Sequence, residues 1–128
     1  MKKVMIIILS ILGVLVLVGA GGVFYITNGL EAGENLQINP VNLKGIADGT
    51  YAGIYQGGRW TNEVAVNVTD HQITKIDVVK SVTIDDPKMA SSLIARVIEN
   101  QNTTVDTISG ATVTSKAYLK SIENALSQ

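Results

Sequence analysis

The stretch from Asp106 to Ser115 holds the densest group of side chains that could do chemistry: five hydroxyls, one acid and one glycine within ten residues. It directly precedes a segment in which apolar residues recur at helical spacing. This spacing predicts a helix from about Ser115 to Leu126, capped by Thr114 or Ser115. Free backbone N–H groups and the positive end of the helix dipole would converge there. Such a place suits a phosphate, and one hydroxyl could itself become a phosphoester. A polar loop with an ordinary helix cap is the alternative.

The other candidate groups have simpler interpretations. His71 lies in a polar turn between predicted strands, and Asp85 and Asp86 precede Pro87, where acidic side chains cap a helix. Trp60 follows two glycines in a predicted loop, where its ring could stack on a planar ligand or cover the edge of the core. The chain has no cysteine and one histidine, which excludes disulfides, thiolate metal sites and a histidine-rich metal site.

The N-terminus predicts a membrane span. After Lys2 and Lys3, residues 4–26 carry no charge, and 23 residues can cross a hydrocarbon core of roughly 30 Å. A cleaved signal peptide is the competing interpretation, although its apolar region is usually only about 7 to 15 residues long. The lysines before the span place the N-terminus in the cytoplasm. We therefore expect residues 1–30 to anchor the chain in membrane lipid as a single-pass helix, with an extracytoplasmic C-terminal domain.

Length and charge limit the remaining possibilities. A chain of 128 residues has room for one small domain beside the anchor. The formal net charge is −1, so the chain has no basic surplus with which to neutralise a phosphate backbone. We therefore expect no binding to nucleic acid.

The chain after the anchor predicts an α+β fold. Residues 31–47 mix glycine, asparagine and proline with scattered apolar residues, and we interpret residues 27–47 as a flexible connection that can include a short ordered stretch, with the linker proper at 31–47. Three strands are predicted over residues 50–56, 63–69 and 73–82, as an antiparallel meander. A helix should then begin after Asp86 and end near Asn100, before the second helix described above. The prediction is a sheet of about three strands packed against two helices, within residues 48–128.

The hydroxyl-rich stretch resembles a known family. Asp106 to Ser115, in one-letter code DTISGATVTS, looks like the flavinylation motif of the FMN-binding domains: an acid, two variable residues, a Ser or Thr, then Gly-Ala-Thr and often Thr-Ser. Related domains occur in the C subunit of the sodium-translocating NADH:quinone reductase and in the G subunit of the Rnf complex. The resemblance extends from about Asp48 to Leu126, with Asp48 to Gly53 similar to the family's first strand.

The resemblance implies a covalent cofactor. A flavin transferase would move FMN from FAD onto Thr112 as a phosphodiester, with Asp106 as the acidic start of the motif and Ser109, Gly110 and Ala111 as its recognition sequence. Thr114 and Ser115 are its continuation. Contacts to the flavin ring cannot be carried over, because Gln56–Thr61 and Ile84–Asp86 depart from the family's pattern. Three aromatic residues near strand ends or turns are candidates for those contacts: Tyr51, Tyr55 and Trp60.

Three functions from different classes follow. The first is an extracytoplasmic flavoprotein that relays electrons between a membrane donor or redox complex and extracytoplasmic partners, a carrier more than a stand-alone enzyme. The second is a flavin-dependent reductase with its own substrate, which about 80 residues and the lack of a visible acid–base pair disfavour. The third is a binding or scaffold domain without redox chemistry.

Overall fold

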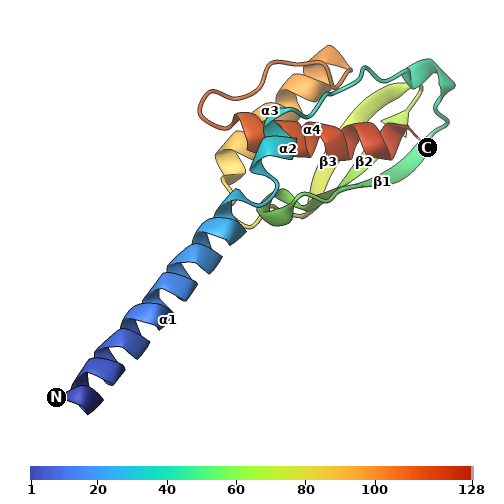
Figure 1. Cartoon of the computed structure of the whole chain (residues 1–128). Helices are drawn as coiled ribbons and strands as arrows, with labels where there is room; N and C mark the ends of the chain where they lie inside the picture. The colour runs from blue at the N-terminus through green and yellow to red at the C-terminus, as the bar shows by residue number, and fades with distance from the viewer. Residues whose placement is uncertain (128) are drawn as a thin grey trace.

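A long apolar helix stands apart from a small α+β domain in the computed structural model, which describes residues 1–127 (Figure 1). Helix α1 spans Lys2–Thr27, and none of its residues is buried. Together with the turn and the short helix α2 (Leu30–Glu34) that follow it, this is the one segment of the described residues long and apolar enough to cross a membrane. The expected span is therefore compatible with the structure.

The three predicted strands form one antiparallel sheet in the order β1-β2-β3. Strand β1 covers Gly49–Tyr55, β2 covers Asn62–Thr69 and β3 covers Gln72–Lys80. The turn between β2 and β3 places Asp70 and His71 at positive φ, which is the two-residue geometry that matches the twist of a hairpin. Alternate residues of β2 are buried, so one face of the sheet forms the core and the other meets solvent.

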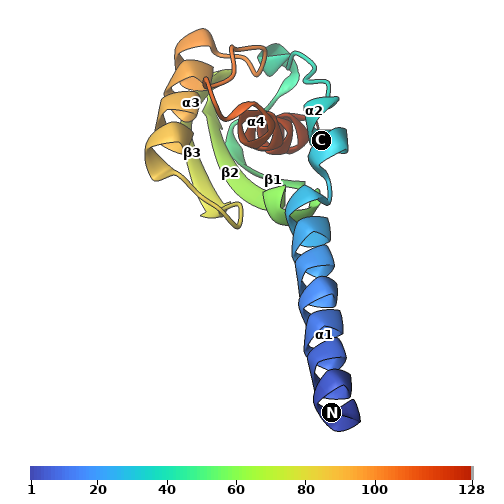
Figure 2. The same cartoon turned by 60° about the vertical axis from the view of Figure 1, so that its left-hand side comes forward.

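Two helices cover the inner face of the sheet. Helix α3 spans Pro87–Asn100 and begins as predicted, with the Asp86 carboxylate accepting from the N–H groups of Lys88 and Met89. Helix α4 spans Thr112–Leu126 and packs against β1 and β2. Figure 2 shows α4 nearly end-on within the curve of the sheet, with α3 and α2 on either side. The α+β architecture is confirmed.

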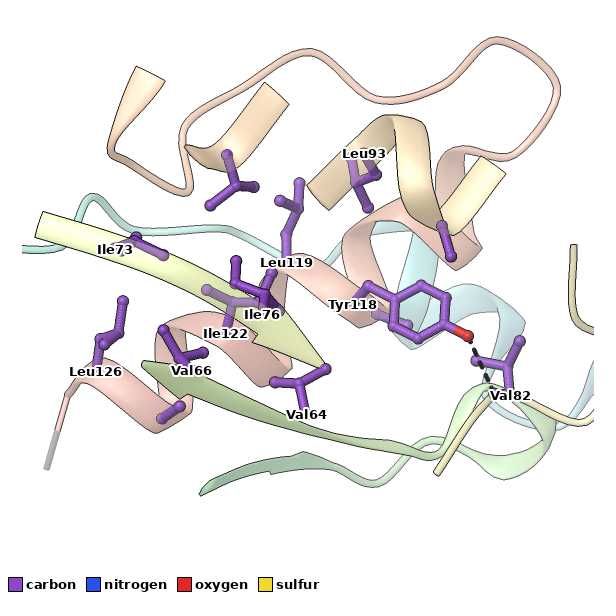
Figure 3. Packing of buried hydrophobic residues seen from close by; sticks show 14 of the residues in the cluster. Val64, Val66, Ile73, Ile76, Val82, Leu93, Tyr118, Leu119, Ile122 and Leu126 are labelled. Carbon is purple, nitrogen blue, oxygen red and sulfur yellow. Dashed lines mark hydrogen bonds between the residues drawn. The ribbon is translucent and has the colours of Figure 1, made fainter. Parts of the chain in front are cut away.

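The core lies between α4, α3 and the sheet (Figure 3). Valines of β2 and isoleucines of β3 face apolar side chains of both helices. Seven residues labelled in Figure 3 are at most 2% exposed: Val64, Val66, Ile73, Leu93, Tyr118, Leu119 and Ile122. Their burial provides most of the driving force that places α4 on the sheet.

Residues 27–47, interpreted from the sequence as a flexible connection with a short ordered stretch, are ordered over more of their length than expected, because much of this segment packs on the domain. Lys116 Nζ donates to the carbonyl oxygen of Glu34 at 2.8 Å, and the buried Glu123 carboxylate accepts from the N–H of Asn39. A short 3₁₀ helix, η1, follows at Leu43–Gly45. Apolar residues of the segment also rest on the core, namely Leu30, Ile38, Val41, Leu43 and Ile46. The segment therefore forms an outer layer over α4.

The contact between α4 and β1 depends on a glycine. A Cβ atom at Gly53 would overlap the carbonyl oxygen of Ser121 and lie 2.6 Å from the backbone nitrogen of Ala125. We expect Gly53→Ala to destabilise the domain by about 1–3 kcal/mol, because the helix backbone must move off the strand. Urea unfolding of the full chain in detergent measures this, with Gly45→Ala as the control, since open space surrounds Gly45. Equal unfolding midpoints for the two variants would contradict the prediction.

Tyr118 ties α4 to the segment that precedes α3. Its buried hydroxyl donates to Asp85 Oδ1 at 3.0 Å. It also accepts from the N–H of Val82 at 3.3 Å, a contact drawn in Figure 3. Burial raises the pKa of the Tyr118 phenol to about 12, and the Asp85 carboxylate acts in the same direction. The folded protein therefore keeps this proton at a pH where an unfolded tyrosine loses it.

This shift predicts a loss of stability at high pH. Because the folded pKa is raised, the contribution is complete below about pH 10 and is lost as the pH rises toward about 12. Tyr118→Phe should be less stable at neutral pH, where the N–H of Val82 loses its acceptor, but should lack this part of the decline. The free energy of unfolding of both proteins, measured from pH 9 to 12, gives the difference. Parallel curves would refute the assignment to Tyr118.

Candidate functional site

Helix α4 begins three residues earlier than the sequence predicted. The structure places its start at Thr112, with Ala111 as the N-cap, so the predicted start and cap at Thr114 or Ser115 are wrong. Ser115 is fully buried, and its hydroxyl accepts from the N–H of Ile108 at 3.1 Å in place of capping a helix end. Thr112 therefore occupies the first position of the helix.

A turn just before the helix explains the glycine of the motif. The N–H of Ala111 donates to the carbonyl oxygen of Ile108 at 3.0 Å, closing a β-turn with Ser109 and Gly110 at its tip. Gly110 has φ +80°, a backbone conformation that residues other than glycine and asparagine rarely adopt. No atom lies within 4 Å of a Cβ built there, so the backbone conformation alone requires the glycine.

The loop ahead of this turn is held by an arginine that the sequence analysis missed. Arg96 on α3 donates from Nη1 to the carbonyl oxygens of Asp106, at 3.0 Å, and Thr107, at 3.3 Å. Since these contacts involve main-chain atoms of the loop, no pattern of side chains signals them. Arg96 thus fixes the start of the motif relative to α3.

The first turn of α4 offers free hydrogen-bond donors beside an exposed hydroxyl. The first helical hydrogen bond runs from the N–H of Ser115 to the carbonyl oxygen of Ala111 at 2.8 Å. Within residues 1–127, the N–H groups of Thr112, Val113 and Thr114 have no acceptor, and Ala111 has no side chain that could cap them. The Thr112 side chain is exposed. Its hydroxyl therefore lies where the helix dipole favours a bound negative charge.

An open cavity of about 370 Å³ lies over this helix start. Its wall comprises Gly110–Thr114, Arg59 and Trp60 from the short 3₁₀ helix η2 (Gly58–Trp60), and Leu30 from α2. The structure therefore brings Trp60 together with Gly110, Ala111, Thr112 and Thr114. Other predicted residues are in the loop or the core but do not line the cavity, namely Asp106, Ser109 and Ser115.

Trp60 contributes little more than an edge to this cavity. Its side chain is 3% exposed, and the guanidinium carbon of Arg59 lies 4.0 Å from the centroid of its ring. One face of the indole is therefore already occupied. Of the two interpretations of Trp60, covering the edge of the core accounts for most of its buried surface, and little of the ring is left to stack on a ligand.

The two candidate tyrosines lie outside the lining of the cavity. Tyr51 donates its hydroxyl to the carbonyl oxygen of Ala47 at 2.6 Å, and the ring of Tyr55 packs close to the backbone of Gly57. Both rings pack against the core, and the hydroxyl of Tyr51 makes a hydrogen bond as well. Arg59 and Leu30, which sequence reasoning missed, line the cavity in their place.

The cavity has the properties that FMN requires. Its volume falls within the range of small-molecule sites, about 300–1,000 Å³. Unpartnered N–H groups and a hydroxyl at the helix start suit a phosphate, and Leu30 and the edge of Trp60 suit an apolar ring. The residues present therefore fit this cofactor.

Comparison with known families agrees with this geometry. The model of the FMN-binding domain matches residues 57–127, which include η2, the whole of β2 and β3, both helices and the complete motif from Asp106 to Ser115. No curated protein matches the chain. Since the match covers more than half of the chain and all but one of the residues around the cavity, the chain belongs to the FMN-binding domain family.

Proposed function

We propose that this protein is a membrane-anchored flavoprotein that carries FMN covalently on Thr112 and relays electrons between a membrane donor and extracytoplasmic partners. The observation that supports it best is the exposed Thr112 hydroxyl, at the first position of α4 and on the wall of the cavity. The match to the FMN-binding domain supports the choice of cofactor.

Among the hydroxyls of the motif, Thr112 is the one suited to modification. Thr114 is only partly exposed and Ser115 is buried, whereas Ser109 lies outside the cavity lining. Attachment forms a bond between Thr112 Oγ1 and the flavin-side phosphorus of FAD and breaks the phosphoanhydride bond, so that AMP leaves. The hydroxyl proton needs a base, and the ring of His71 is engaged elsewhere with the carbonyl oxygens of Leu43 and Ile46. A separate flavin transferase would supply that base.

The lining of the cavity favours a carrier over a reductase. Bound FMN supplies one- and two-electron chemistry. Among the lining residues, Arg59 is the one ionisable group, and an arginine does not exchange its proton near neutral pH. The chain thus provides placement, retention and a charged wall, with no acid–base pair for a bound organic substrate.

The first prediction concerns attachment. Thr112→Ala should abolish covalent flavin when the protein is made together with a flavin transferase, because no other hydroxyl has the same exposure at the helix start. The free energy of unfolding should change little, by at most about 0.5 kcal/mol for an exposed residue. Intact mass and flavin fluorescence after denaturation measure attachment. Thr114→Ala is the matched control and should keep the flavin.

Flavin found on Thr107 or Thr114, or none on the wild-type chain despite an active transferase, would contradict this assignment.

The second prediction concerns topology. The lysines that precede α1 should keep the N-terminus in the cytoplasm, which leaves the domain outside. Protease added to intact spheroplasts should digest the domain. A domain that is cut only after lysis would reverse the orientation, and a mature chain starting near Gly22 would show a cleaved signal in place of an anchor.

A further inference from the structure

The end of the N-terminal helix is joined to the domain by a close contact between two backbones. Gly29 has φ +88°, and a Cβ atom there would lie 2.8 Å from the carbonyl oxygen of Gly57. Gly58 has φ +58°, and a Cβ atom there would overlap the carbonyl oxygen of Asn28. In Figures 1 and 2 the short green helix η2 lies directly beside the end of α1. Glycines on both sides therefore allow a joint without side chains between the two segments.

Arg59 crosses this joint. Its Nε donates to the carbonyl oxygen of Ile26, in the last turn of α1, at 3.0 Å, while its guanidinium plane covers the ring of Trp60. Its two terminal amino groups have no acceptor among residues 1–127. Arg59 also lines the cavity, together with Leu30 on α2. Leu30, just after the anchor, is therefore part of the cavity wall, and the carbonyl oxygen of Ile26 in the anchor holds Arg59 in place.

We propose that the cofactor site is shared between the FMN-binding domain and the end of the N-terminal helix. In this arrangement the carbonyl oxygen of Ile26 positions Arg59, and Arg59 binds the pyrimidine edge of the flavin ring and favours the reduced flavin. This inference rests on the proposed function, because it requires FMN in the cavity.

The distribution of donors favours the ring over the phosphate as the partner of Arg59. A phosphodiester on Thr112 already has the free N–H groups of the first turn of α4 within reach. Arg59 is the one cation among the lining residues, and its free amino groups suit the oxygen and nitrogen acceptors of the ring. Uptake of two electrons and one proton leaves one added negative charge on the ring, which a fixed guanidinium stabilises.

The test measures the midpoint potential of the flavin in the full-length holoprotein. Arg59→Gln should make the flavin at least tenfold harder to reduce, which for a two-electron couple is a potential about 30 mV lower. Arg59→Lys keeps the charge and should restore most of the potential. Titration with dithionite in the presence of redox dyes gives the values, and intact mass confirms that each variant carries FMN.

A second pair of variants tests the role of the anchor. Gly29→Ala leaves every charge in place but cannot keep the contact with Gly57, so it should shift the potential in the same direction as Arg59→Gln. Gly45→Ala, at a position surrounded by open space, is the matched control and should behave as wild type.

The protein without flavin gives an independent measurement. Trp60 is the only tryptophan of the chain, so its emission reports on the guanidinium that covers it. Acrylamide should quench this emission more strongly in Arg59→Gln and in Gly29→Ala than in wild type or Gly45→Ala.

The outcomes separate the two proposals. Flavin-loaded Arg59→Gln and Gly29→Ala proteins with the wild-type potential would overturn the role of Arg59 and leave the proposed function intact. Lower flavin loading at an unchanged potential would also overturn it, because Arg59 would then serve attachment. A wild-type chain without flavin would instead refute the proposed function itself. If Arg59→Gln does not fold, Gly29→Ala still decides the question, because it is expected to lower the potential while every charge stays in place.

Discussion

The packing of α4 on the concave face of the sheet is the constraint on which the site depends. The apolar side of α4 is fully buried against β1 and β2, and the absence of a side chain at Gly53 lets the two backbones approach closely. Thr112 is the first residue of this helix, so its position follows from the packing of the residues after it. The N–H groups at the exposed end of α4 are unpaired because the first turn of a helix has no preceding helical carbonyl groups to accept from them, and the Ala111 side chain cannot cap them.

The sequence predicted those elements whose patterns are local. The alternating valines of β2 and the Asp86-Pro87 start of α3 led directly to the observed strand and helix, since each signal acts over a few neighbouring residues. The start of α4 was placed too late, because Thr112 and Thr114 were interpreted as loop and cap residues. The structure instead buries the hydroxyl of Ser115 and extends the helix backwards over both threonines.

The rest of the site could not be predicted from local patterns. Residues 30–46 contribute apolar side chains to the core without any period, and their irregular backbone is satisfied by the lysines and the glutamate of α4. Arg59 and Arg96 act on carbonyl oxygens far away in sequence or in another element. A hydrogen bond to a main-chain carbonyl carries no signature in the partner's sequence, so no local pattern distinguished either arginine.

The joint between α1 and η2 changes how the protein would meet its partners. With α1 in a bilayer, a cavity whose wall begins at Leu30 stays at one height above the lipid, because only two residues separate α1 from α2. Under the proposed function, encounters with redox partners would then be a search in two dimensions by lateral diffusion of the helix, and one face of the cofactor would be presented in a constant orientation. Electron tunnelling falls off steeply with distance. Under the proposed function, a fixed height would therefore select partners by where their own redox centre lies relative to the membrane surface.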